Sequence, residues 1–89
     1  MKELSTLNWN DMMLYNIDLI RRNYDYSTGL LNTIEQKIIE NVIKCKEDIF
    51  NYIDEYITEE DEFLLGPINL QCMIEERDWT RRVMQEFAI

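Results

Sequence analysis

The apolar residues between positions 32 and 57 recur at steps of three and four, which is the repeat of an α-helix and not of a strand. One row consists of Leu31, Ile34, Ile38, Val42, Cys45, Ile49, Tyr52 and Tyr56. A second row beside it consists of Ile39, Ile43, Phe50, Ile53 and Ile57. Together the rows are wider than the seam between two helices requires. The pattern therefore predicts one long central helix over residues 32–57 that contacts more than one neighbour.

The length and composition of the chain indicate a single helical domain. Eighty-nine residues can bury one modest core, so we expect one domain over residues 1–89. The hydrophobic content of 46% supplies enough apolar surface to offset the entropy of folding. Two glycines and one proline allow few tight turns, which favours a few long helices over many short strands. The expected fold is an all-α bundle of three to four helices around the central helix.

Capping residues and breakers indicate where the outer helices begin. After a short frayed lead over residues 1–6, Asn8 is a suitable N-cap for a first helix over residues 8–23. Gly66-Pro67 is the clearest break in the chain, because proline cannot continue a helix. A last helix is therefore expected over residues 68–87.

The start of the central helix has two alternatives. Asn32 followed by Glu35 has the spacing of a capping box, whereas Ser27 or Thr28 would start the helix earlier. Gly29 lies in the preceding connection, where we expect it to take a positive φ angle that other residues avoid.

A short additional helix is expected over residues 58–65. Carboxylates at the end of the central helix oppose its dipole, so a break in the chain at this point is favourable. Thr58 and Asp61 have the spacing of a capping box, and the acidic residues after Thr58 suit the first turn of a new helix. The apolar residues 63–65 are then expected to fold back on the core.

The overall charge limits the classes of partner. The chain has 18 Asp and Glu, 9 Lys and Arg and no His, so its net charge is −9. This charge opposes direct binding to nucleic acid or to an anionic membrane and favours a basic protein partner. Cys45 and Cys72 form no CxxC motif and are expected to be buried, reduced fillers of the core. With no signal peptide and no apolar run of membrane-spanning length, we expect a cytoplasmic protein of a bacterial or phage-infected cell.

Motifs for catalysis, metal binding or cofactor attachment are missing from the sequence. The chain has no His, no glycine-rich phosphate loop and no GxSxG or HExxH motif, so we expect no enzyme, no metal and no cofactor. An EF-hand reading of the acidic run would put Phe63 and Leu65 at calcium-ligand positions. A phosphopantetheine carrier would have this size and acidity, but residues 25–30 lack the Asp-Ser-Leu that such carriers present.

Residues 47–62 contain eight carboxylates and no Lys or Arg. These candidate partner-binding residues are Glu47, Asp48, Asp54, Glu55, Glu59, Glu60, Asp61 and Glu62. One interpretation is a solvated face that keeps the protein soluble. The other is a recognition surface whose negative charge is relieved by a basic partner, with Tyr52, Tyr56 or Phe63 as anchors.

The favoured hypothesis is a non-enzymatic, protein-binding inhibitor that docks this carboxylate-rich surface on a basic partner. In size and acidity the chain resembles small phage-encoded inhibitors of nucleic-acid-processing enzymes, such as anti-CRISPR proteins, which act as nucleic-acid mimics. The alternative hypothesis is a homo-oligomer or a structural subunit of a larger assembly. It rests on apolar residues that a small bundle would not fully bury, namely Trp9, Met12, Met73, Trp79 and Met84.

Overall fold

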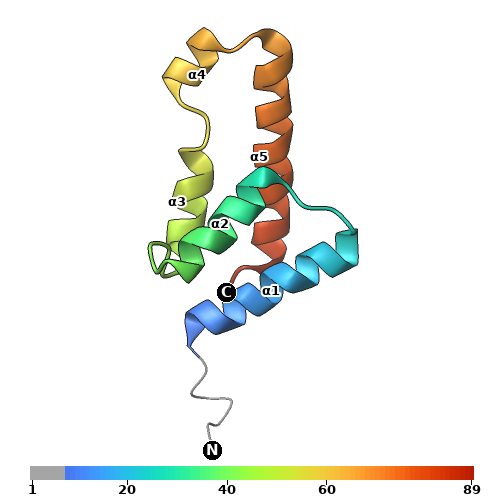
Figure 1. Cartoon of the computed structure of the whole chain (residues 1–89), viewed down its shortest axis with the longest axis vertical. Coiled ribbons are helices and arrows are strands. Elements are labelled where there is room, and N and C mark those ends of the chain that lie inside the picture. Colours follow the sequence, from blue (N-terminus) through green and yellow to red (C-terminus); the bar gives the residue numbers. More distant parts are fainter. Residues whose placement is uncertain (1–7) are drawn as a thin grey trace, which may run out of the picture.

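The computed structural model describes residues 8–89, which form five α-helices joined by short connections (Figure 1). The helices are α1 (Trp9–Tyr24), α2 (Gly29–Ile39), α3 (Lys46–Asp54), α4 (Glu59–Leu64) and α5 (Pro67–Phe87). Within this range there is no strand, and no helix is long and apolar enough to cross a membrane. The all-α fold is confirmed, whereas the expected lead over residues 1–6 lies outside the described residues.

The core lies where α1, α2 and α3 meet the C-terminal half of α5. Figure 1 shows α5 running along the long dimension, with α1 crossing near its C-terminal end and α4 at the opposite end. The buried apolar residues are Met13, Ile17, Ile20, Leu30, Leu31, Ile34, Ile38, Ile43, Ile49, Ile53, Val83, Met84 and Ala88. Every helix except α4 contributes to this set.

The prediction of one helix over residues 32–57 is wrong, because the chain breaks between α2 and α3. Asn41 takes the left-handed conformation with φ 62°. Its N–H donates to the Ile38 carbonyl at 3.0 Å, and the Val42 N–H donates to the Lys37 carbonyl at 2.9 Å. These two bonds form a Schellman motif, which ends a helix by satisfying its last carbonyls. Asparagine suits this position because it adopts the left-handed conformation more readily than most residues.

The connection after this break also changes the expected environment of the cysteines. Cys45 is the N-cap of α3 but makes no side-chain capping bond. The first turn is instead held by Asp48 Oδ2, which accepts from the Lys44 N–H at 3.0 Å. Cys45 and Cys72 are both free and exposed, so the expectation that they fill the core is wrong.

The other predicted helix starts agree with the structure. Asn8 caps α1 by accepting from the Asp11 N–H at 2.8 Å. Thr58 and Asp61 form both bonds of the capping box at the start of α4, and Pro67 opens α5. Polar partners only three residues apart set the starts of α1 and α4, whereas α5 starts at a proline, which suits the first helical position because its missing N–H is not needed there.

For α2 the structure selects the earlier of the two alternative starts. Thr28 is the N-cap, and its Oγ1 accepts from the Leu31 N–H at 3.0 Å. Gly29 is the first residue of the helix and has no positive φ, which corrects the expectation for this glycine. Asp25, at the end of α1, takes the left-handed conformation in its place with φ 49°.

A buried polar chain attaches the start of α2 to α5. Thr28 and Thr80 are the only buried polar residues in the described part of the chain, and their hydroxyls lie 2.7 Å apart. Because the Thr80 hydroxyl donates to the Glu76 carbonyl at 2.7 Å, the Thr28 hydroxyl donates to Thr80. Glu76 Oε1 also accepts from the Leu30 N–H at 2.8 Å. A carboxylate is therefore held at the N-terminus of α2, where the helix dipole favours it.

The Glu76 carboxylate is also linked to the end of α3, through Tyr56, which lies two residues after that helix. The Tyr56 hydroxyl donates to Glu76 Oε1 at 2.7 Å. Burial, together with this bond to a carboxylate, raises the pKa of Tyr56 to about 12. Tyr56 thus stays protonated and serves as a fixed donor between α5 and the end of α3.

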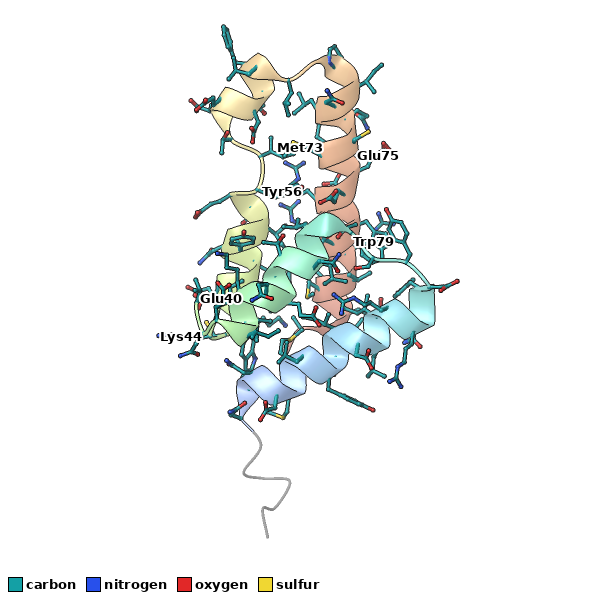
Figure 2. The ribbon with its side chains drawn as sticks, viewed as in Figure 1. Glu40, Lys44, Tyr56, Met73, Glu75 and Trp79 are labelled. Carbon is teal, nitrogen blue, oxygen red and sulfur yellow. The ribbon has the colours of Figure 1, made fainter. Side chains whose placement is uncertain are left out.

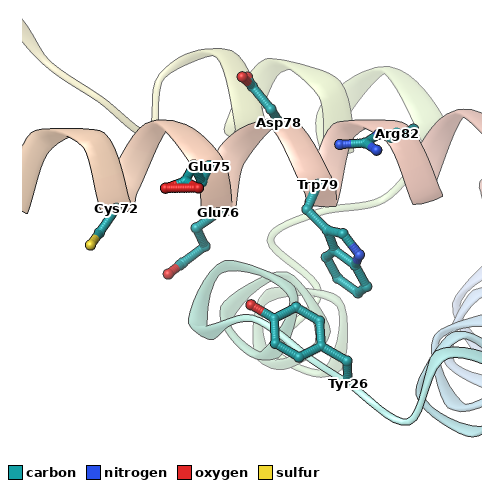
Figure 3. A pocket seen from close by; sticks show the side chains of 7 residues that line it. All are labelled: Tyr26, Cys72, Glu75, Glu76, Asp78, Trp79 and Arg82. Carbon is teal, nitrogen blue, oxygen red and sulfur yellow. The ribbon is translucent and has the colours of Figure 1, made fainter.

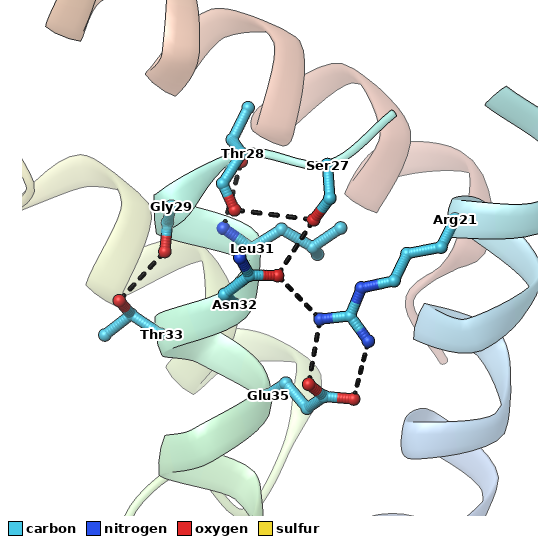
Figure 4. A network of polar contacts seen from close by, with 8 residues as sticks. All are labelled: Arg21, Ser27, Thr28, Gly29, Leu31, Asn32, Thr33 and Glu35. Atoms are coloured by element: carbon cyan, nitrogen blue, oxygen red, sulfur yellow. Dashed lines mark hydrogen bonds and ion pairs between the residues drawn. The ribbon is translucent and has the colours of Figure 1, made fainter. Parts of the chain in front are cut away.

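An ion pair joins α1 to α2 (Figure 4). The two terminal nitrogens of Arg21 donate to the two carboxylate oxygens of Glu35, each at 2.8 Å. Asn32 Oδ1 also accepts from Arg21 at 2.7 Å. The hydrogen bond to Arg21 holds the pKa of Glu35 below its ordinary value. Glu35 therefore serves as an interhelix partner and not as part of a capping box with Asn32.

Replacement of Asn41 tests the break between α2 and α3. Asn41→Ala should lower the free energy of unfolding by about 1 kcal/mol, because alanine disfavours the left-handed conformation. Asn41→Gly should remain within about 0.5 kcal/mol of the wild type. Urea unfolding followed by far-UV circular dichroism measures both changes. A continuous helix would reverse the order of the two variants, since alanine is the best helix former and glycine one of the poorest.

Candidate protein-docking surface

The N-terminal half of α5 extends beyond the hydrophobic core. This helix has 21 residues, whereas α3 beside it has 9. At the rise of an α-helix these lengths correspond to about 31 Å and about 14 Å. The buried residues of α5 are Thr80, Val83 and Met84, all in its C-terminal half. The beginning of α5 therefore projects, together with α4, from the packed part of the molecule (Figure 1).

The projecting end carries exposed apolar side chains. Phe63 is 87% exposed, Leu64 67% and Ile68 80%. We call residues 59–68 the α4–α5 tip; it comprises α4 and the beginning of α5. Large apolar side chains this exposed, and this close together in the chain, are typical of interaction sites on soluble proteins.

The expectation that residues 63–65 fold back on the core is wrong. Leu65 is partly buried, but α4 contains no buried residue. This helix is only six residues long, and its first four residues are acidic. A single short turn in this arrangement has no apolar stripe along its length to place against a neighbouring helix. Its capping box satisfies the backbone N–H groups of the helix start locally.

Four of the eight predicted carboxylates lie in the first turn of α4: Glu59, Glu60, Asp61 and Glu62. Asp61 accepts from the Thr58 N–H at 3.1 Å and is thereby occupied as part of the cap. Glu55, the residue directly after α3, precedes this group in the chain. Within residues 8–89, Glu55, Glu59, Glu60 and Glu62 form no ion pair and accept no side-chain hydrogen bond, so their charges remain available.

The remaining three predicted carboxylates lie outside this group. Glu47 and Asp48 occupy the first turn of α3, at the far end of that helix from α4. Asp54 pairs with Arg81 of α5 at 2.7 Å and joins α3 to α5. The eight residues therefore do not form one continuous surface. Of the eight, four share the first turn of α4, and Glu55 lies four residues before them in the chain.

The tip belongs to a larger segment without basic residues. Residues 47–76 contain ten Asp and Glu and no Lys or Arg. The rest of the chain contains nine Lys and Arg against eight Asp and Glu, which nearly cancel. The net charge of the protein is thus concentrated in α3, α4 and the first half of α5. Nearby basic side chains that could neutralise the tip are lacking in this part of the sequence.

The proposed aromatic anchors differ in their accessibility. Tyr52 and Tyr56 are partly buried and pack against the core, which makes them structural. Figure 2 shows Tyr56 and Met73 in the region between α3 and α5. Phe63 is the accessible anchor of the three. The exposure of Leu64 and Ile68 was not expected. The sequence did carry a signal for it, because the helix that contains Leu64 is short and begins with a block of acidic residues.

The groups needed for a metal centre are not assembled in the described part of the chain. No set of three His, Cys, Asp or Glu side chains within residues 8–89 is arranged to hold a metal ion. Glu59, Glu60 and Glu62 are exposed residues of one short helix, and Asp61 is used in its cap, which favours recognition of a surface over enclosure of an ion.

In comparisons with known proteins, no family model, no curated protein and no solved structure matches this chain. The function is therefore inferred from the geometry and charge of the molecule itself.

The separation of tip and core predicts different consequences for two apolar replacements. Phe63→Ala should change the free energy of unfolding by less than about 0.5 kcal/mol, because Phe63 is exposed. Ile17→Ala, at a fully buried position, should lower it by about 2–4 kcal/mol. Both values come from chemical denaturation of the two variants under the same conditions. A large loss for Phe63→Ala would mean that α4 is packed in solution and that the tip is not a free surface.

Proposed function

We propose that this protein is a non-enzymatic binding module that docks its α4–α5 tip on a basic surface of a partner protein and thereby inhibits that partner. The observation that carries the proposal is the coincidence of exposed Phe63, Leu64 and Ile68 with the unpaired carboxylates of α4. Burial of each such apolar side chain in an interface contributes about 1.5–3 kcal/mol. The carboxylates around them steer the encounter and select a partner of opposite charge.

The charge of the tip argues against contact between two tips. Two copies meeting there would bring Glu59, Glu60 and Glu62 of one copy against the same residues of the other. Like charges that face each other across an interface are destabilising by several kcal/mol. A partner with Lys and Arg around an apolar depression would relieve the repulsion and also cover the apolar residues.

Proteins that bind nucleic acid offer basic surfaces of this kind. Their grooves hold several Lys and Arg side chains that neutralise phosphates. An acidic helical tip can occupy such a groove in place of the nucleic acid, which is the mode of action of a nucleic-acid mimic. The proposed class is therefore an inhibitor of the anti-CRISPR type, and a phage-encoded inhibitor of an RNA-guided nuclease is the specific form of the proposal.

Neutralisation of the tip tests this function. The variant Glu59→Gln/Glu60→Gln/Glu62→Gln should lose about tenfold or more in affinity for the partner. Its matched control, Asp11→Asn/Glu40→Gln/Glu86→Gln, removes the same charge from exposed positions elsewhere and should bind as the wild type does. Binding is measured against a CRISPR nuclease with its guide, a bacterial RNA polymerase and a helix-turn-helix repressor. Wild-type affinity should fall between about 50 and about 300 mM NaCl, because salt screens exposed charges.

Two results would contradict the proposal. Equal loss of affinity in both triple variants would show that only the net charge matters and that the tip is not the binding surface. Binding that is insensitive to salt, or no binding to any of the three basic partners, would contradict the proposed inhibitor function.

A second copy of the chain is the other candidate partner, and one observation favours a head-to-tail form of it. The connection after α2 exposes Ile39 by 57% and Val42 by 59%. Lys44 and Lys46 follow within a few residues and are also exposed. This apolar, basic surface of the α2–α3 connection is complementary to the α4–α5 tip. Repeated contacts between the tip of one copy and this surface of the next would build a ring or a filament.

Light scattering over a range of protein concentrations tests the head-to-tail assembly. The expected result is a mass that rises with concentration and returns to that of the monomer in Lys44→Gln/Lys46→Gln, which removes the complementary charges. A monomer mass at every concentration would exclude it.

A further inference from the structure

A groove lies on the side of α5 that faces the connection between α1 and α2. Cys72, Glu75, Glu76 and Trp79 line it from α5, at the spacing of one helix face. Tyr26 lines it from the α1–α2 connection, and the space between has a volume of about 650 Å³. Figure 3 shows Glu76, Trp79 and Tyr26 on the same side of the helix, with the Tyr26 ring opposite the indole.

The two aromatic rings form a right-angled corner. The centroids of Tyr26 and Trp79 are 4.9 Å apart, and their planes meet at 87°. Tyr24 packs against Trp79 in a similar edge-to-face arrangement, with centroids 5.9 Å apart. Tyr24 and the core thus hold the indole in place, while Tyr26 remains 56% exposed. Aromatic faces carry negative potential, so a corner of this kind attracts a cation.

Carboxylate oxygens beside the corner have no partner. Glu75 is exposed and makes no ion pair or hydrogen bond within residues 8–89. Glu76 uses Oε1 for Leu30 and Tyr56, and its Oε2 accepts no hydrogen bond from the described residues. Tyr56 and the start of α2 therefore fix the position of Glu76 and leave one oxygen for a further donor.

The other charged residues lining the groove differ in what they face. Asp78 pairs with Arg77 at 3.3 Å, and Figure 3 shows it pointing away from Tyr26. Arg82 also lines the groove and makes no ion pair in the described part of the chain. Arg82 therefore lowers the attraction for a cation without neutralising both glutamates.

We infer that this groove binds an arginine side chain of the basic partner. A guanidinium is planar and stacks on an aromatic face, and its several N–H donors suit the two carboxylates that line the groove, Glu75 and Glu76. A quaternary ammonium would need an aromatic cage on several sides, whereas this groove is open and has two rings.

The position of the groove connects it to the α4–α5 tip. Ile68, Cys72, Glu75 and Trp79 follow one another at i, i+4, i+7 and i+11, which keeps them on one face of α5. Figure 2 shows Glu75 and Trp79 on the side of α5 away from Tyr56 and Met73. A partner that covers the exposed Ile68 can extend along this face and place an arginine in the corner. The source of the arginine rests on the proposed function, whereas the groove itself does not.

The experiment uses acetyl-arginine amide as the probe and acetyl-citrulline amide as its uncharged analogue of nearly the same shape. Binding is followed by NMR from the indole N–H of Trp79, and the Trp9 indole, which donates to the Ile89 carbonyl, is the internal control. The arginine probe should shift the Trp79 signal saturably, and citrulline should not shift it. Glu75→Gln should weaken binding about threefold, whereas Arg82→Gln should strengthen it by a similar factor.

Each contrary result overturns this inference. Equal shifts with citrulline would show that charge is not recognised, and equal binding of tetramethylammonium would show a site that does not select the guanidinium. Unchanged affinity in both Glu75→Gln and Arg82→Gln would place the probe elsewhere. The tip variant Glu59→Gln/Glu60→Gln/Glu62→Gln should bind the probe within about twofold of the wild type, because screening is strong beyond a Debye length. The proposed arginine binding in the groove and the proposed docking of the tip can thus be contradicted independently.

Discussion

The attachment of α2 to α5 by Thr28, Thr80 and Glu76 organises the rest of the molecule. This contact satisfies two buried hydroxyls and places a carboxylate at the start of α2, so that no buried polar side-chain atom among the described residues lacks a partner. With α2 fixed in this way, the pair of Arg21 and Glu35 brings α1 against it. Because Glu76 and Thr80 lie near the middle of α5 and beyond it, α2 packs there, and the buried residues of α5 are all in its C-terminal half.

This arrangement separates the parts of the protein that hold the fold from the part that we propose as a docking surface. The buried apolar residues lie in α1, α2, α3, the end of α5 and the segments that flank these helices, whereas α4 and the start of α5 carry exposed apolar residues and unpaired carboxylates. A surface that contributes little to stability can be shaped for a partner without weakening the core. The cost is an exposed apolar tip, which its dense negative charge protects from contact with other tips.

The features that were predictable from the sequence are those whose partners are close in the chain. Asn8 and the capping box of Thr58 and Asp61 were predictable because donor and acceptor are three residues apart. The break at Asn41 was not, because the apolar rows continue in phase across it and one asparagine inside a helix costs only up to about 0.7 kcal/mol relative to alanine. The pairing of Asp54 with Arg81 joins residues 27 positions apart, a distance at which spacing carries no information.

The sequence by itself determined the helical class, most helix ends and the excess of acid, since these follow from residue types and local spacing. Only the tertiary structure decided which carboxylates remain unpaired and which apolar residues remain in water. The physical reason is that burial depends on where the helices cross. The crossings lie in the C-terminal half of α5, so Phe63, Leu64 and Ile68 are exposed although their chemistry alone would place them in the core.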